Sequence, residues 1–467
     1  MLKNYIKLIF RNLWKNKTTS AINLTGLTIG IGCSLLLLVY VRYESSFDTF
    51  SDDSDSIFFH YYEQKGANAR YVGLSSDEDY KNFVTNYASI EDVLKLRNNE
   101  YTLVPAGNPS KKIDVNSWFS SPNFFDFFDF PLVDGNTQTV LSDPSSIVIT
   151  QEIAAKLFGN ENPIGKTVTI DASSFQKDLI VTGIAESVSN SHIQFEAILP
   201  WDMTAPDGRQ IAQMWFQRSL FTYVKTVKGK KIDDLLEEAN RPLIENGDIE
   251  EYELLFKPLE DVYLGSGNIQ FMAFESGNRQ TINGLFYIAI IILLVASINY
   301  VNLQTAKGVR RSLEVGVRKM MGAYRTQLVG QFLLEAIILT MLASVLAVLL
   351  IDLSLPSFNE LTGKSFTMDF LYDQGLAQFL VMITFITALL SGVYPAFILS
   401  SFKPSRILKS SSSANSSGRN GRRALIFVQF GISVFLISVT FIAFQQTQFI
   451  NKKDQKYYLI LLITKKT

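Results

Sequence analysis

Five long stretches with almost no charged side chains interrupt this sequence, and they constrain its fold more than any other feature. Four of them carry no Asp, Glu, Lys or Arg: Ala21–Val41, Gln280–Ala306, Gly375–Phe402 and Ala424–Asn451. The fifth, Leu328–Ile351, carries a single acid, Glu335. About 20 consecutive apolar residues cross the hydrocarbon core of a bilayer as a helix. The pattern therefore predicts a membrane protein with five spans.

The charges between these stretches are divided by sign. The long segment Tyr43–Gly284 holds 37 acidic against 19 basic residues, whereas the rest of the chain holds 7 acidic against 24 basic residues. The short segments before the first span, between spans two and three and between spans four and five are basic. Basic loops stay in the cytoplasm. We therefore expect a cytoplasmic amino terminus and one large acidic domain outside.

The amino-terminal region has the charge of a signal peptide but not its length. Five basic residues precede Ala21 without an acid, as in the basic region of a secretory signal. The apolar run that follows is too long for a signal peptide, and no small-residue cleavage site follows it. We interpret it as a signal anchor. The one cysteine, Cys33, lies in this run, so no intramolecular disulfide is possible.

The large acidic segment has mixed strand and helix signals. Short runs rich in β-branched residues predict strands, and two segments with helical periodicity predict helices. Thr150 is a suitable N-cap for the first helix. The sequence predicts an α+β domain in two lobes, with strands at Ser146–Thr150, Thr167–Asp171, Leu179–Gly183 and Phe221–Lys225 and helices at Gln151–Phe158 and Ile232–Glu245.

A dense aromatic cluster runs from Phe124 to Phe130. Large aromatic side chains dominate protein cores, so we assign the cluster to the core of this domain. A site for a hydrophobic ligand is the alternative.

Chemistry of the catalytic or metal-binding kind is not indicated. Gly159–Thr167 resembles a phosphate-binding loop, but five residues instead of four separate its glycines, and a turn before a strand is the better interpretation. His60 and His192 stand far apart, and neither has a neighbour at metal-ligand spacing. The many carboxylates of the segment are interpreted as a solvated face. We therefore expect no enzyme activity, no cofactor and no metal in this chain.

The segment Arg310–Gln327 is the strongest candidate for a functional site. Apolar residues recur at helical spacing between charged ones, which predicts an amphipathic helix on the cytoplasmic side. It is either an interfacial helix held by lipid headgroups or a docking helix for a cytoplasmic partner. Glu335, an acid inside a span, is a second candidate, with a structural role equally open.

Short motifs are spread along nearly the whole chain. They are Arg11–Lys17, Ile22–Gly30, Ser121–Phe125, Phe128–Leu132, Phe158–Lys166, Asn190–Ile193, Asn299–Leu303, Glu314–Ala323, Gln331–Glu335, Gly392–Phe397 and Phe402–Pro404. Together these motifs resemble those of the FtsX-like permeases with a MacB-type periplasmic core domain, which are subunits of ATP-binding-cassette systems.

The resemblance implies a partner and a mechanism. A separate cytoplasmic ATPase subunit would couple to the amphipathic helix and drive motions that reach the outer domain, for efflux or extraction of a peptide, drug or lipoprotein. The residues it implies for this coupling are Arg311, Glu314, Val315, Arg318, Lys319, Met320 and Gly322. It also implies the bacterial inner membrane, a homo- or heterodimer of permease halves, a periplasmic adaptor and contact with membrane lipid, but no nucleic acid. Control of an outer cell-wall hydrolase and a membrane stress sensor are the alternatives.

Relatives with eight spans repeat the unit of one span, outer domain and three spans. This chain has one such unit and the opening span of a second, so we interpret it as truncated or frameshifted. The sequence predicts a basic amino terminus (1–20), span one (21–42), the MacB-type core domain (43–279), span two (280–306), the coupling helix (307–327), span three (328–351), an extracytoplasmic loop (352–374), span four (375–402), a cytoplasmic linker (403–423), span five (424–451) and an atypical tail (452–467).

Overall fold

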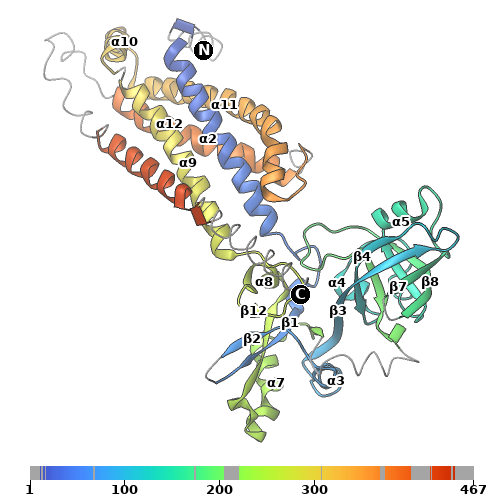
Figure 1. Cartoon of the computed structure of the whole chain (residues 1–467). Coiled ribbons are helices and arrows are strands. Elements are labelled where there is room, and N and C mark those ends of the chain that lie inside the picture. The colour runs from blue at the N-terminus through green and yellow to red at the C-terminus, as the bar shows by residue number, and fades with distance from the viewer. Residues whose placement is uncertain are drawn as a thin grey trace, which may run out of the picture. The chain divides into compact units, whose positions relative to one another are not determined.

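The chain forms two compact units in a computed structural model (Figure 1). The membrane unit comprises Met1–Val41 and Asn283–Thr467, and the inserted domain comprises Arg42–Ile282. The structure describes residues 11, 14–15, 17–66, 69–172, 175–204, 220–306, 308–368, 374–400, 421, 423–442 and 445–446. The expected linker and tail fall almost wholly outside these residues.

Five helices among the described residues are long and apolar enough to cross a membrane, which confirms the five predicted spans. They are α2 (Lys17–Glu44), α9 (Arg279–Ala306), α11 (Arg325–Thr362), α12 (Gln374–Ser400) and a helix over Arg423–Ile442. The short helix α10 (Gly308–Met320) lies between α9 and α11 in the chain.

The loop predicted over 352–374 is wrong over its first half. Helix α11 continues through Asp352 and Pro356 and ends only at Thr362. It stops there because Gly363 has a φ of 67°, a left-handed conformation that glycine adopts without strain and that commonly ends helices.

Small residues set how closely the membrane helices pack. A Cβ atom on Gly30 of α2 would lie 2.4 Å from the Cβ of Ala296 on α9, so at this point only the Ala296 methyl lies between the two helices. Ser34 of α2 also donates a hydrogen bond to the carbonyl of Ala289 at 2.8 Å. Close backbone approach and hydrogen bonds between helices stabilise packing in lipid, where apolar burial adds little.

We expect Gly30→Ala to destabilise the membrane unit by about 1–3 kcal/mol, because the added methyl forces α2 away from α9. The matched control is Gly330→Ala on α11, since a Cβ there meets nothing within 4 Å. The control should be neutral or slightly stabilising, because alanine favours helix. Thermal unfolding of the purified full chain in detergent compares them. Equal midpoints for the two variants would contradict the close approach.

The inserted domain is built on one mixed sheet that runs through its whole width. The order of hydrogen-bonded strands is β12-β2-β1-β10-β3-β4-β9-β6-β8-β5, with β11 paired to β1 and β7 paired to both β3 and β8. The strands are β1 (Ile57–Gln64), β2 (Arg70–Val72), β3 (Ile90–Pro105), β4 (Ile113–Ser120), β5 (Leu132–Asp134), β6 (Ser146–Thr150), β7 (Thr167–Ala172), β8 (Phe175–Ala185), β9 (Ala197–Pro200), β10 (Phe221–Thr226), β11 (Tyr252–Pro258) and β12 (Ile269–Gln270).

Helices cover this sheet in three places, each above its own buried cluster. Towards one end, α3 (Asp77–Thr85) and α7 (Ile232–Asn246) pack on β1 and β11, and towards the other end α5 (Gln151–Phe158) packs on β6 and β8. Between them lie α4 (Phe124–Phe128) and α8 (Leu259–Gly265). The two predicted lobes therefore share one continuous sheet.

The local predictions for this domain are confirmed. The aromatic cluster is core, since all five phenylalanines between Phe124 and Phe130 are at most 2% exposed. Thr150 caps α5 by accepting the backbone N–H of Ile153 at 3.5 Å. The glycine-rich segment after α5 is a turn, with a hydrogen bond from the Lys166 N–H to the Pro163 carbonyl at 3.0 Å.

Candidate functional site

The candidate coupling segment is a helix followed by a sharp turn. The helix predicted over Arg310–Gln327 is wrong in its last part, because α10 ends at Met320. Gly322 has a φ of 96°, which breaks the helix, and α11 begins at Arg325. The N–H of Tyr324 donates to the Gln327 side chain at 3.1 Å and so caps the new helix. The turn separates the two helices and allows α10 to leave the direction of α11.

Arg318 fastens α10 to α11. Its guanidinium donates to Glu314 one turn earlier at 2.6 Å and to the Gln331 amide oxygen on α11 at 2.5 Å. Both acceptors bind the same planar guanidinium. Its fixed fork of N–H groups can donate hydrogen bonds in two directions, which suits this position better than the ammonium of a lysine would. Two of the predicted residues, Glu314 and Arg318, therefore pair through the i,i+4 spacing of one helix, and the fold adds Gln331 from α11.

Lys319 and Arg325 fasten the same region to the last residue of α12. The Lys319 ammonium donates to the carbonyl of Ser400 at 2.6 Å, and Arg325 donates to the Ser400 hydroxyl at 3.3 Å. Positive charge is favourable at a helix C-terminus, where carbonyls point outward. Burial lowers the pKa of the Lys319 ammonium, and the neighbouring charge of Arg325 lowers that pKa further.

The two faces of α10 differ in exposure. Val315 is 1% exposed and packs with Leu328, Phe332 and Ala396 of α11 and α12. The opposite face of α10 and the turn that follows it carry exposed apolar side chains that we call the α10 patch, with Val317 at 51%, Met320 at 59%, Met321 at 84% and Tyr324 at 73% exposure. A large exposed apolar surface marks an interaction site more often than a random position does.

Two further predicted residues, Arg311 and Glu335, lie outside these contacts. Arg311 lies in α10, but its side chain is outside the described part of the chain. Glu335 is on α11 and is 4% exposed, so the structure places it inside the helix bundle. Its burial agrees with a structural role at least as well as with a functional one.

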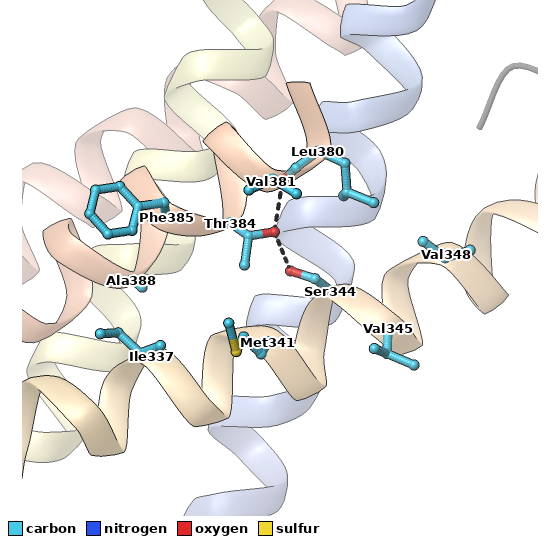
Figure 2. Close-up of a pocket in the computed structure, with 10 residues that line it drawn as sticks. All are labelled: Ile337, Met341, Ser344, Val345, Val348, Leu380, Val381, Thr384, Phe385 and Ala388. Atoms are coloured by element: carbon cyan, nitrogen blue, oxygen red, sulfur yellow. Dashed lines mark hydrogen bonds between the residues drawn. The ribbon is translucent and has the colours of Figure 1, made fainter. Parts of the chain in front are cut away.

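A cavity of about 430 Å³ lies between α11 and α12 (Figure 2). Its lining is apolar except for two hydroxyls, those of Ser344 and Thr384, which lie 2.8 Å apart. Each hydroxyl also lies within hydrogen-bonding distance of a carbonyl of its own helix, Ser344 of Thr340 at 3.0 Å and Thr384 of Leu380 at 2.8 Å. Because a hydroxyl has one proton, one of the two donates to its carbonyl and accepts a hydrogen bond from the other hydroxyl. A lining of this kind suits hydrocarbon, because it presents no charged group to a ligand.

Sequence reasoning missed a group of buried polar residues in the inserted domain. The interpretation of the carboxylates as a solvated face is wrong for Glu44 and Asp48, which are 3% and 2% exposed. Asp48 lies beside His192, although 143 residues separate them in the chain, so local spacing carries no signal for the pair. Within the described residues, no three His, Cys, Asp or Glu side chains are grouped so that they could hold a metal ion.

Five spans, a sheet domain between the first two and an exposed helix between the second and third define a multi-span membrane protein with one large inserted domain. Residues 20–241 match the MacB-like periplasmic core domain, and residues 286–404 match the FtsX-like permease C-terminal domain. The chain therefore has the two domains of an FtsX-like permease with a MacB-like periplasmic core domain, as its motifs predict.

Similar proteins include exporters and permeases. The chain is 23% identical over 411 residues to the macrolide export ATP-binding/permease protein MacB of Wolinella succinogenes, covering 84% of this chain and 58% of that protein. It is 27% identical over 207 residues to the ABC transporter permease YknZ of Bacillus subtilis, covering 43% and 46%. The solved periplasmic region of MacB from Actinobacillus actinomycetemcomitans has a TM-score of 0.33 and 16% identity, covering 45% of this chain and 91% of that one. The chain spans less than two thirds of the length of the curated relatives compared with it.

Proposed function

We propose that this chain is the permease subunit of an ATP-binding-cassette system and that α10 docks a separate cytoplasmic ATPase subunit. The α10 patch is the observation that carries the proposal. Its four side chains, from Val317 to Tyr324, are more than half exposed and stand beside charged residues of the same short segment. Interfaces combine such an apolar centre with a polar rim.

The contacts that hold α10 to α11 and α12 suit it to transmit motion. A docking helix moves the spans only if it is fixed to them, and α10 is held by Arg318 to α11 and by Lys319 to α12. Val315 adds a buried apolar contact to both helices. A displacement of α10 by a partner would therefore reach spans three and four together.

The remaining parts of the proposal follow from charge and from the relatives. Basic segments beside α10 favour a cytoplasmic position for it and an outer position for the acidic domain. The name of the relative MacB describes a permease and an ATP-binding function in one protein. We propose export or extraction of a substrate from the outer side of the inner membrane, with a second permease half, an adaptor and membrane lipid as further partners.

The test begins with purification of the tagged full chain from native membranes in mild detergent, followed by mass spectrometry of what copurifies. We expect a near-stoichiometric soluble subunit with nucleotide-binding motifs. A copurified outer adaptor supports efflux, whereas a copurified wall hydrolase supports the regulatory alternative. A folded chain recovered without an ATPase contradicts the proposal.

Exchanging the charges of Glu314 and Arg318 probes the coupling itself. The double variant Glu314→Arg with Arg318→Glu keeps an ion pair within α10, but it loses the guanidinium that donates to Gln331. We expect membrane insertion to persist and permease-stimulated ATP hydrolysis to fall about tenfold, the effect of losing one charged hydrogen bond. Stimulated hydrolysis at the wild-type rate would contradict a role for this contact.

A further inference from the structure

The motif Asn190–Ile193 has no part in the proposed docking site, but it makes several hydrogen bonds to residues 46–48. It lies between β8 and β9 and binds the segment that directly continues α2. The side-chain amide of Asn190 donates to the Ser46 carbonyl at 2.9 Å, and the backbone carbonyl of Asn190 accepts the Asp48 N–H at 2.8 Å. The Tyr43 hydroxyl donates to the carbonyl of Ser189 at 2.7 Å. The motif therefore holds the chain as it enters the inserted domain.

A row of three buried polar side chains, Asp48, His192 and Tyr223, lies at the centre of this contact. Asp48 Oδ1 accepts the Ser191 hydroxyl at 2.9 Å and the His192 N–H at 3.0 Å, and Asp48 Oδ2 lies 2.8 Å from His192 Nδ1. On the other side of the ring, His192 Nε2 lies 2.6 Å from the hydroxyl of Tyr223. None of Asp48, His192 and Tyr223 is more than 3% exposed. A carboxylate buried this deeply is stable only when it is paired and hydrogen-bonded.

The protonation of Tyr223 agrees with this arrangement. Complete burial raises the pKa of Tyr223 well above its usual value, and the nearby charge of Asp48 raises that pKa further. The phenol therefore keeps its proton and can donate to His192 Nε2. The other ring nitrogen, Nδ1, then faces the Asp48 carboxylate, with Oδ2 at 2.8 Å.

The backbone at Asp48 is equally specialised. Its φ is 61°, in the left-handed region that only glycine, Asn and Asp visit readily. The turn brings the Asp48 N–H to the Asn190 carbonyl and the Asp48 carboxylate to His192. The conformation is thus held from both the main chain and the side chain.

Tyr223 carries the contact into the middle of the sheet. It lies on β10, which pairs with β1 on one side and β3 on the other. Its ring packs against Phe59 and Phe128, each with a centroid distance of 5.1 Å. The row of polar side chains thus begins at the exit of α2 and ends in the main aromatic core.

We propose that Asp48, His192 and Tyr223 form an anchor that locks the segment leaving α2 onto strand β10, so that this segment and the centre of the sheet behave as one rigid body. The anchor requires no ATPase partner and stands independently of the proposed docking site. Glu44 and Phe47 make a second attachment, to Tyr263 of α8, through a 2.7 Å hydrogen bond and a stacked ring pair. The effect of breaking the anchor should therefore centre on Asp48 and not on the whole segment.

Hydrogen exchange with mass spectrometry on the purified full chain tests the anchor. Asp48→Asn is the main variant, because asparagine tolerates the same backbone conformation while it removes the charge and replaces one acceptor oxygen by an NH2 donor. We expect exchange at least about tenfold faster in peptides covering 46–53 and 188–193, where amides depend on the pair, because a charged hydrogen bond is lost. The β7–β8 hairpin in the same domain should be unchanged.

Two further variants test whether Asp48 and Tyr223 act as one unit. Tyr223→Phe removes a single oxygen and should accelerate the same two peptides by a smaller factor. The double variant should exchange no faster than Asp48→Asn alone, because the residues act as one unit. Asp52→Asn is the matched control, since Asp52 is exposed four residues further on, and it should match the wild type.

Two results would overturn the anchor. One is wild-type exchange in both peptides after Asp48→Asn and after Tyr223→Phe. The other is an equal acceleration of the two peptides and the β7–β8 hairpin in both variants, since that result would reduce the group to general support of the fold.

Discussion

Met321→Glu is expected to abolish retention of the proposed ATPase subunit by the purified chain. Met321 is 84% exposed at the end of α10 and is the most exposed side chain of the α10 patch. A carboxylate at an apolar interface loses its hydration without gaining a partner. Central interface residues contribute about 2 kcal/mol or more, so we expect at least a 30-fold loss of affinity. Copurification and a binding titration with the recovered subunit measure it.

The control for this variant is Leu361→Glu. Leu361 is an apolar residue of nearly the same exposure, 85%, at the far end of α11. It should retain the ATPase subunit fully and insert into the membrane normally. Equal retention by both variants would show that the α10 patch is not the docking surface.

Phe124→Ala is expected to cause the largest loss of stability in the inserted domain. The Phe124 ring is fully buried and contacts Phe125, Phe130 and Phe195 with centroid distances of 5.1, 5.2 and 5.6 Å. Truncating a buried phenylalanine removes its transfer free energy and leaves a cavity, for a cost of about 3–5 kcal/mol. Thermal unfolding of the full chain, with proteolysis of the inserted domain as a second readout, measures the change.

Phe271→Ala is the matched control, because Phe271 is 58% exposed in the same domain. Substitutions at such exposed positions usually change the free energy of unfolding by no more than about 0.5 kcal/mol. If Phe124→Ala and Phe271→Ala lower the free energy of unfolding equally, the aromatic cluster is not the main core. The five rings of the cluster are at most 2% exposed and belong to one buried cluster, which favours core over the alternative of a hydrophobic ligand site.

The α10 region shows which features of a helix the spacing of apolar residues predicts and which it does not. The spacing of apolar residues predicts a helix between spans two and three, and α10 is there. The same spacing continues past Met320, so it predicts too long a helix. One glycine with a left-handed backbone ends the helix, and periodicity cannot detect it because a single break barely changes the pattern. The contacts of Lys319 and Arg325 with Ser400 were equally invisible, because they join residues more than 70 positions apart.

The sequence by itself determined the spans, the class of the inserted domain, its aromatic core and the family. Those features depend on local composition, on the length of apolar runs and on short motifs, all of which can be read along the chain. Only the tertiary structure decided which faces of α10 are exposed, that Gly30 meets Ala296, and that Asp48, His192 and Tyr223 meet inside the sheet. The physical reason is that each of these depends on segments that are distant in sequence and become neighbours only when one continuous sheet or one helix bundle forms.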